Sequence, residues 1–91
     1  MGVNIVLPSA LAAITGGVRS MEVEAESVRG ALAQVATRFP TAASRLLDDS
    51  GSIRRHINVF VGETNVRDLN GIDTPLKSDD DVIIIPAVSG G

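Results

Sequence analysis

The chain has 91 residues, of which 44% are hydrophobic and none is cysteine, and its formal net charge at pH 7 is −3. This length and apolar content predict one small packed domain, and the lack of cysteine excludes disulfides, thiol nucleophiles and thiolate metal sites. The negative charge disfavours nucleic acid as a partner, because the phosphate backbone is itself negatively charged.

The first 25 residues show the pattern of a β-hairpin. In residues 3–7 the side chains alternate between two faces, which predicts a strand. Proline cannot donate to a strand ladder, so Pro8 ends this strand or lies at an edge. Residues 9–15 are expected to form an apolar loop, and Gly16-Gly17 a flexible turn. Residues 18–25 alternate again and predict the second strand of the hairpin.

One main helix is predicted to follow the hairpin. Ser27 is a favourable N-cap, and the helix is expected to run to about Arg38 and to stop before Pro40. Its apolar positions form one stripe, which comprises Val28, Leu32, Val35, Ala36 and Phe39. Gly30 inside this helix costs up to about 1 kcal/mol relative to alanine, and we expect it to allow a close approach of the helix to the sheet.

The C-terminal half is predicted to contain shorter elements. In chain order they are a short helical turn (41–47), a loop (48–52), a strand (56–61), a turn (62–65), a brief pairing of Val66 and Arg67, an irregular stretch (69–76), a polar turn (77–81) and a last strand (82–86). Branched apolar residues on both faces of the last strand favour a central position in the sheet.

The predicted order of elements is that of a β-grasp fold. A hairpin, a helix and then late strands give an α+β domain, with a mixed sheet and one main helix packed across it. In this topology the last strand lies beside the first. We expect residues 1–86 to form the β-grasp domain and residues 87–91 to form a flexible C-terminal Gly-Gly tail.

The polar side chains do not suggest a self-sufficient active site. His56 is the only histidine, so it has no second histidine with which to share a metal ion. Asp79-Asp80-Asp81 lacks the ligand spacing of a calcium loop and is interpreted as a solvated turn. Arg54, Arg55 and Arg67 could form a basic spot for a protein partner, although a solvated edge is the simpler interpretation. We therefore predict no metal site and no enzymatic activity.

The sequence contains no membrane or export signal that we can identify. No apolar run approaches the roughly 20 residues that a membrane-spanning helix requires. The N-terminus lacks a basic region followed by an apolar segment, which is the pattern of a signal peptide. We expect a cytoplasmic protein with no membrane partner.

The most informative stretch is the C-terminus, Pro86-Ala87-Val88-Ser89-Gly90-Gly91. The strand-forming run 82–85 leads into it, and no residue of the sequence follows the two glycines. Small residues are tolerated at frayed termini, which is the simpler interpretation. The contrast between a rigid strand and a tip without side chains nevertheless favours a tail that presents its carboxylate.

These features resemble the ubiquitin-like sulfur carriers over the whole chain. The resemblance rests on the strand-hairpin-helix order, the Asp-rich turn and the ending Val-Ile-Ile-Ile-Pro-Ala-Val-Ser-Gly-Gly. Thr15-Gly16-Gly17 and Ile57-Asn58-Val59-Phe60-Val61 are most similar to the actinobacterial carriers that supply cysteine synthesis. The family includes the small subunit of molybdopterin synthase and the sulfur carrier of the thiamine pathway.

The resemblance implies a reaction at Gly91. An activating enzyme of the ubiquitin-E1 type would adenylate the Gly91 carboxylate with ATP and magnesium, so the chain itself would bind no cofactor. Sulfide or a persulfide would then displace AMP and leave a thiocarboxylate, which serves a biosynthetic acceptor enzyme. Val88, Ser89 and Gly90 would thread a narrow channel of the activating enzyme. Glycine at positions 90 and 91 would let the backbone pass where a Cβ does not fit.

A docking surface on the domain is also expected, because ordering five tail residues costs on the order of 5–10 kcal/mol. If Val82 and Ile84 face the helix, Ile85 faces outward beside Phe60. The candidate partner-binding patch therefore comprises Phe60, Ile85 and Val88. The alternative is that Phe60 caps a second small core under residues 9–15.

Two other functions remain open from the sequence. A ubiquitin-like modifier would be joined to lysines of target proteins through Gly91. A plain β-grasp interaction module would never be activated. For a carrier, the sequence leaves the acceptor open among cysteine, molybdopterin, thiazole and sulfur-containing natural products.

Overall fold

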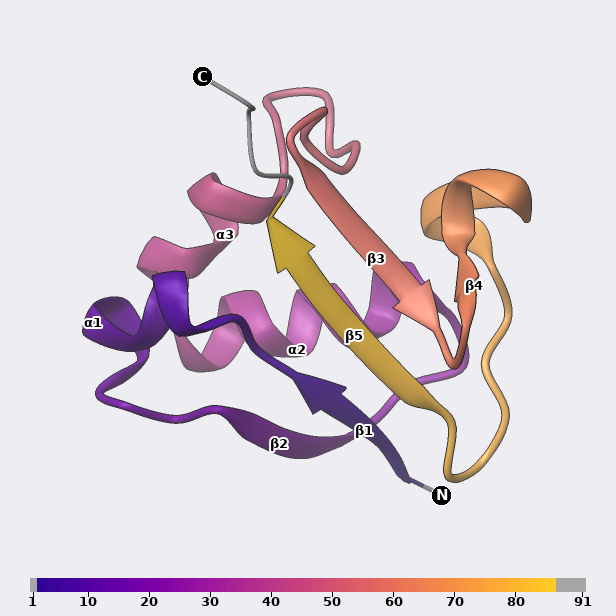
Figure 1. Ribbon diagram of the computed structural model, residues 1–91, viewed down its shortest axis with the longest axis horizontal. Helices are drawn as coiled ribbons and strands as arrows, with labels where there is room; N and C mark the ends of the chain where they lie inside the picture. Colours follow the sequence, from indigo (N-terminus) through magenta and orange to yellow (C-terminus); the bar gives the residue numbers. More distant parts are fainter. Residues whose placement is uncertain (1, 87–91) are drawn as a thin grey trace.

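The computed structural model describes residues 2–86; Met1 and residues 87–91 lie outside the described part of the chain. It contains one five-stranded sheet with the strand order β2-β1-β5-β3-β4 (Figure 1). The strands are β1 (Gly2–Val6), β2 (Ser20–Glu24), β3 (Ile57–Val61), β4 (Thr64–Asn65) and β5 (Asp81–Pro86). β1 and β5 run parallel and the other neighbouring pairs run antiparallel, so the prediction of a mixed sheet is confirmed.

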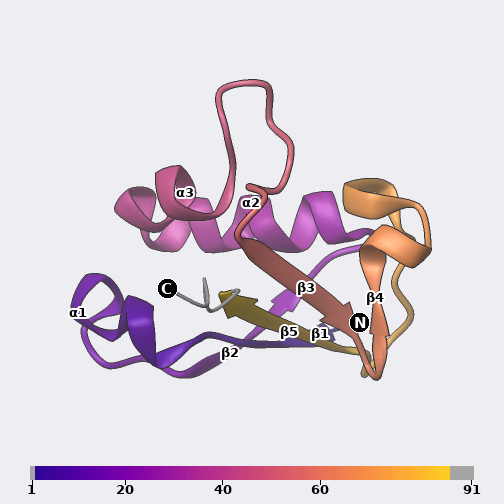
Figure 2. The ribbon, with the colours of Figure 1, turned by 45° about the horizontal axis from the view of Figure 1, so that its top comes forward.

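The two longer helices lie on one face of this sheet. α2 (Val28–Arg38) crosses it, and α3 (Pro40–Leu46) packs beside α2 (Figure 2). The shorter helices are α1 (Ala12–Thr15) and three 3-10 turns, η1 (Ser9–Leu11), η2 (Val66–Asp68) and η3 (Gly71–Asp73). This is the predicted α+β, β-grasp architecture with one main helix across the sheet. No helix of the described residues is long and apolar enough to cross a membrane.

The core lies between the sheet and α2. In β5, Val82 and Ile84 are buried, and in β1 Val3 and Ile5 are buried, so alternate side chains of both central strands face the helix. The other buried apolar side chains are Leu7, Leu11, Met21, Val23, Val28, Ala31, Leu32, Val35, Ala42, Leu46, Ile57, Val59 and Val66. β5 lies between β1 and β3, which confirms its predicted central position beside the first strand.

α2 begins and ends where the sequence predicts. Ser27 is the N-cap, and its Oγ accepts a hydrogen bond from the Gly30 N–H at 3.2 Å. The Val28 N–H donates to the Thr74 carbonyl at 3.0 Å, which satisfies a donor that has no partner inside the helix. Pro40 follows the end of α2 and occupies the first turn of α3, the predicted short helical turn.

The apolar loop predicted for residues 9–15 is wrong, because these residues form η1 and α1. Leu11 and Thr15 are buried, and a buried segment must pair its own backbone N–H and C=O groups, which a helical turn achieves. The Thr15 hydroxyl donates to the Val18 carbonyl at 3.0 Å. Gly16 then ends α1 in the left-handed conformation, at φ 66°, so the predicted turn at this glycine is confirmed.

The pairing predicted for Val66 and Arg67 is also wrong. Thr64 and Asn65 pair with β3 instead, and Val66 begins η2. Val66 is fully buried, and the Asn65 side chain accepts a hydrogen bond from the Arg67 N–H at 2.9 Å. This side-chain cap stabilises a helical turn at the point where a longer strand would have continued.

Gly30 does not bring α2 close to the sheet. A Cβ at this position would lie 3.5 Å from the Ala25 Cβ and 3.6 Å from the Ser27 Oγ, which are ordinary van der Waals separations. The expected role of Gly30 is therefore wrong, and the site has room for a methyl group.

We expect Gly30→Ala to raise the free energy of unfolding by about 0.5–1 kcal/mol, because alanine loses less backbone entropy in a helix than glycine. Chemical denaturation measures the change. Gly16→Ala is the control, since it adds the same methyl group at φ 66° and should lower stability. A destabilised Gly30→Ala protein would mean that α2 packs more tightly here than the Cβ separations indicate.

Candidate functional site

The end of β5 determines where the C-terminal tail begins. Pro86, the last described residue, pairs with Ile57 at the start of β3. Because β5 is the central strand, the tail starts from the middle of the sheet at this end. The predicted tail residues Val88, Ser89, Gly90 and Gly91 lie outside the described residues, so their assigned roles stay predictions.

An apolar surface lies beside this point on the face of the sheet opposite α2. Ile83 of β5 pairs with Val6 on one side and Phe60 on the other, so the three residues form one row across the sheet. Ile85 lies two residues further along β5 and is 45% exposed. We call these four residues, Val6, Phe60, Ile83 and Ile85, the outer patch.

The structure favours a Phe60 side chain that faces outward over the alternative that Phe60 caps a second small core under residues 9–15. Leu11 belongs to the main core, and Ile14 packs against it, so the residues 9–15 contribute to the same core as α2. Phe60 is half-buried and lies opposite Ile83, on the face away from the buried Val59 and Ile84. Sequence alternation therefore placed Phe60 and Ile85 correctly, whereas their binding of a partner stays a prediction.

A groove of about 310 Å³ adjoins the outer patch at the base of the tail. It forms because β1 ends at Val6 and turns away at Pro8, which leaves the end of β5 without a described neighbour on that side. Its lining comprises residues 6–10, Arg19 and residues 83–86. Sequence reasoning did not find this groove, although Pro8, which ends the first strand early, was the available signal.

Two of the three arginines suggested as a basic spot, Arg54 and Arg67, donate hydrogen bonds within the domain. The Arg67 guanidinium donates to the Asn58 Oδ1 at 2.6 Å and to the Arg54 carbonyl at 3.0 Å. The Arg54 Nε donates to the Ser44 carbonyl at 2.7 Å. Arg67 thus ties the start of β3 to η2.

His56 is exposed and adjoins β3. It lines a hollow of about 230 Å³ with Asp48, Arg54 and Arg55. Among residues 2–86, no three histidine, cysteine, aspartate or glutamate side chains lie close enough together to hold a metal ion.

The acidic turn before β5 is closed by its own hydrogen bonds. The Asp80 carboxylate accepts from the Lys77 N–H at 2.7 Å, and the Asp79 N–H donates to the Gly2 carbonyl at 2.8 Å. Asp79 adopts φ 70°, a conformation that aspartate tolerates better than most residues. These contacts favour a structural turn over a cation site.

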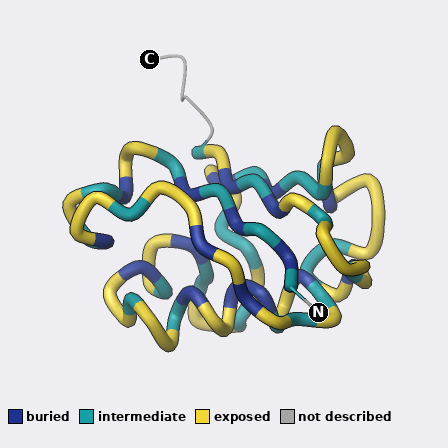
Figure 3. Tube along the Cα trace, turned by 90° about the horizontal axis from the view of Figure 1, so that it is seen from below, coloured by how far each residue is buried: buried dark blue, intermediate teal, exposed yellow. Residues whose placement is uncertain are grey.

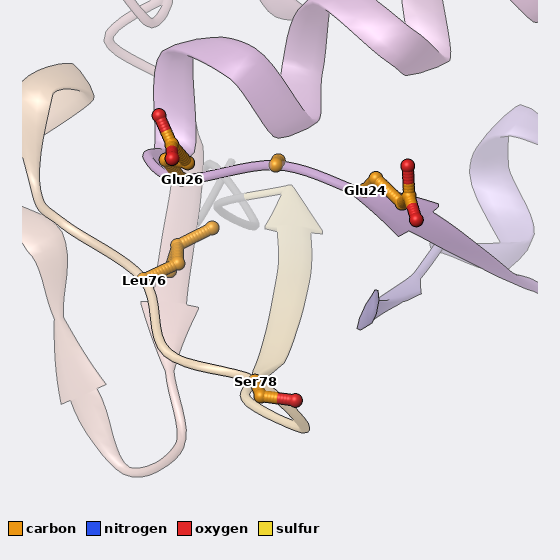
Figure 4. A pocket seen from close by; sticks show the side chains of 5 residues that line it. Glu24, Glu26, Leu76 and Ser78 are labelled. Carbon is orange, nitrogen blue, oxygen red and sulfur yellow. The ribbon is translucent and has the colours of Figure 1, made fainter. Parts of the chain in front are cut away.

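A pocket of about 610 Å³ lies at the other end of the sheet (Figure 4). It is lined by Glu24, Ala25, Glu26, Leu76 and Ser78. Glu24 pairs with Gly2 at the beginning of β1, whereas the tail leaves beyond the end of that strand. The pocket is therefore remote from the base of the tail, and its lining contains no cationic side chain.

The loop before β3 contains a carboxylate with a shifted pKa. The Asp48 Oδ1 accepts hydrogen bonds from the Ser50 hydroxyl at 2.6 Å and from the Ser52 N–H at 3.1 Å. These bonds favour the charged form and hold the pKa of Asp48 below its ordinary value. The predicted loop at 48–52 is thus confirmed, and the Asp48 carboxylate stabilises it through these hydrogen bonds.

Because the pKa of Asp48 is lowered in the folded protein, its charge stabilises the fold above the ordinary pKa of about 3.8 that it has in the unfolded chain. This contribution is lost as the pH falls through the folded value. We expect Asp48→Asn to be less stable than the parent at neutral pH, with a difference that shrinks in acid. Thermal unfolding of both proteins from neutral to acidic pH measures the difference; a constant difference would show that the charge is not involved.

Comparison with known proteins supports a single family. The family model described as the ThiS family matches residues 5–91. The chain is 30% identical to the sulfur carrier protein CysO of Mycobacterium tuberculosis (strain ATCC 25618 / H37Rv), and the alignment covers 100% of both chains. The BexX/CysO complex of Amycolatopsis orientalis contains a chain with a TM-score of 0.90 and 32% identity, covering 98% of this chain and 99% of that one. SAMP1 from Haloferax volcanii has a TM-score of 0.84 and 26% identity, with 100% of both chains covered.

Proposed function

Because the chain belongs to the ThiS family, we propose that it carries sulfur as a thiocarboxylate on Gly91. It is a sulfur carrier of the CysO type, and in this proposal it acts in the cytoplasm as a protein co-substrate of other enzymes. The observation that carries the proposal is the family match, which includes the strand β5 and continues through the Gly-Gly ending to residue 91.

The proposed reaction has two steps. In the first, an oxygen of the Gly91 carboxylate attacks the α-phosphorus of ATP on an E1-like enzyme, and pyrophosphate leaves. In the second, sulfide or the terminal sulfur of a persulfide attacks the carbonyl carbon of the acyl-adenylate, and AMP leaves. With sulfide the product is directly the thiocarboxylate; with a persulfide, reduction of the acyl disulfide by a thiol is also required. An acceptor enzyme then uses the thiocarboxylate sulfur as a nucleophile.

The place where the tail begins supports this proposal. Residues 87–91 span at most roughly 16–18 Å when extended, so the domain must dock close to the nucleotide site of its partner. Pro86 ends the central strand, and the outer patch and the groove lie directly beside it. Docking through Phe60, Ile85 and Val88 would therefore place the Gly91 carboxylate within reach of that site.

Apolar burial at this surface offsets the ordering of the tail. Complete burial of a phenylalanine covers 150–250 Å² and contributes roughly 4–6 kcal/mol before the costs of association. Phe60 is already half-buried in the domain, so docking adds only the remaining part of this contribution. The CysO of Amycolatopsis orientalis forms a complex with BexX, so a similar protein does assemble with a partner chain. We infer that the E1-like enzyme and the sulfur-accepting enzyme of this chain use the outer patch in turn.

A second candidate function is that of a protein modifier. It is favoured by the likeness to SAMP1, a small archaeal modifier protein. In that case an amine of a target protein, rather than sulfide, attacks the activated Gly91 and AMP leaves. Lys77 is the only lysine of this chain and is exposed, so it is the only lysine at which one copy could modify another.

Intact mass spectrometry after incubation with the activating enzyme, ATP and sulfide tests these functions. The proposed carrier gains the mass difference between oxygen and sulfur, located on Gly91. Higher-mass conjugates would instead favour the modifier, and the Lys77→Arg variant separates conjugation between copies from conjugation to other proteins. If the mass of the chain is unchanged although the activating enzyme is active, both functions are excluded and the β-grasp interaction module is the remaining function.

A further inference from the structure

The outer patch has an arginine on each side at the end of the sheet where the tail begins. On the side of β1, Arg19 lines the groove at the base of the tail, together with Ile85 and Pro86. On the side of β3, the Arg67 guanidinium donates to the Asn58 Oδ1 at 2.6 Å, and Asn58 is the residue that pairs with Ile85. The exposed Ile85 side chain is therefore flanked by two cationic groups.

Neither arginine is neutralised by a carboxylate of the described domain. Among residues 2–86 the exposed Arg19 side chain forms no hydrogen bond or ion pair. The Arg67 guanidinium is held only by neutral oxygens, the Asn58 Oδ1 and the carbonyls of Arg54 and Arg55. A guanidinium has five N–H donors, so Arg67 keeps donors for a further acceptor. Both arginines thus retain their charge beside an apolar surface.

Many of the carboxylates gather at the opposite end of the sheet. Buried and exposed residues alternate along the strands, whereas the turns at the strand ends are mostly exposed (Figure 3). The Glu22 side chain lies against Gly2 at the beginning of β1. The acidic residues of the strand ends and turns at this end of the sheet are Glu24, Glu26, Glu63, Asp79, Asp80 and Asp81. Near the tail, the carboxylate of Asp48 is engaged by its own loop. The domain is therefore polar, with cations beside the tail and carboxylates at the far end.

This arrangement restricts the surface that can cover the outer patch. A partner that buries Ile85 and Phe60 also removes water from the flanking guanidinium groups, and an arginine without a partner is costly to bury. Carboxylates compensate this cost best, because they accept two parallel N–H bonds from one guanidinium. The acidic end of a second copy would supply carboxylates too, but such head-to-tail contacts would cover the base of the tail.

We propose that the E1-like enzyme receives this domain on an apolar depression with a carboxylate on each side, one paired with Arg19 and the other with Arg67. The inference rests on the proposed function, because a partner that takes up the tail has to dock at this end of the sheet. The same charges orient the encounter: an acidic enzyme surface attracts the tail end and repels the acidic end. The docking surface thus selects its partner by charge as well as by apolar contact.

Titration of the full chain with the activating enzyme, without ATP and at low salt, tests the pairing at Arg19. We expect Arg19→Glu to weaken binding about tenfold, because it replaces attraction by repulsion at the rim of the buried surface. Arg19→Lys keeps the charge and should bind within about threefold of the parent. Lys77→Glu is the control: it makes the same change of charge in the acidic turn at the far end, where Lys77 contributes only its backbone N–H, and should leave the affinity unchanged.

Salt dependence separates charge pairing from structural damage, which matters for Arg67 because it also bonds within the domain. At low salt Arg67→Gln is expected to weaken binding about threefold. At about 0.5 M salt the charges are screened, so the effects of Arg67→Gln and Arg19→Glu should both shrink to less than about twofold. A loss that persists at high salt would show that the substitution disturbed the fold and would overturn the pairing at that arginine.

Equal binding of Arg19→Glu and the parent at low salt, or an equal loss from Lys77→Glu, would overturn the proposal. So would a sedimentation coefficient of the parent that rises with concentration and does not rise for Arg19→Glu, because the occupant would then be a second copy. The proposed function is judged separately, by the mass gain on Gly91 of the parent. Arg19→Glu at saturating concentration should still gain this mass, since its tail is unaltered. A parent that binds the enzyme but gains no mass would contradict the carrier function and leave the pairing of Arg19 standing.

Discussion

Deletion of Gly91, or the substitution Gly90→Val, is expected to abolish formation of the thiocarboxylate and to leave the melting temperature unchanged. Deletion removes the carboxylate from its place at the end of the tail, and valine adds a branched Cβ where we propose a channel that admits only backbone. The described buried core is complete without the tail, since all its members lie between Val3 and Ile84. Incubation with the activating enzyme, ATP and sulfide, followed by intact mass measurement, determines the product.

Ser89→Ala is the matched control for the tail, because it changes a neighbouring side chain but keeps it small. It should retain thiocarboxylate formation. If Gly90→Val is still activated, the channel is wider than proposed and glycine is not required there. A clear drop in melting temperature for either tail variant would mean that the tail packs on the domain.

The second large effect distinguishes the two faces of β5. Ile84 is 1% exposed and Ile85 is 45% exposed, so the same substitution acts on opposite sides of one strand. Ile84→Ala is expected to lower the free energy of unfolding by about 2–5 kcal/mol, because it leaves a cavity in the core. Ile85→Ala should change stability by only about 0.5 kcal/mol, as is usual for surface positions.

For binding to the partner we expect the reverse order, with the larger effect from Ile85→Ala, when both variants are folded. We expect Ile85→Ala to weaken association with the E1-like enzyme by about 1–3 kcal/mol, as truncation of an interface anchor does. Binding titration and chemical denaturation on the same preparations measure both quantities. Unchanged binding by Ile85→Ala would remove the outer patch from the docking surface and direct attention to the groove at Arg19.

A second adjacent pair on β3 tests the same distinction independently. Val59 is buried and Phe60 lies in the outer patch. Phe60→Ala should weaken partner binding with little loss of stability, and Val59→Ala should do the opposite. Loss of several kcal/mol of stability in Phe60→Ala would mean that this ring belongs to a core after all.

The sequence alone determined the elements whose signal is local. Ser27 is a helix cap because its own side chain accepts from the Gly30 N–H, and Gly16 turns the chain because it tolerates positive φ. Alternation along 82–85 was sufficient to separate the buried Ile84 from the exposed Ile85, since a strand has a side-chain period of two. The most specific part of the family resemblance is likewise local, since it is the contiguous motif at the C-terminus.

The tertiary structure decided whatever depends on residues far apart in the chain. Residues 9–15 are helical because Leu11 and Thr15 are buried, and burial is not visible in a short apolar run. Gly30 has space for a methyl group because the Ala25 Cβ lies 3.5 Å from the added position. Helix propensity gives no information about this distance. The groove beside Pro86 and the central position of β5 arise from the strand order. That order is set by packing between distant segments, whereas sequence patterns report the preferences of neighbouring residues.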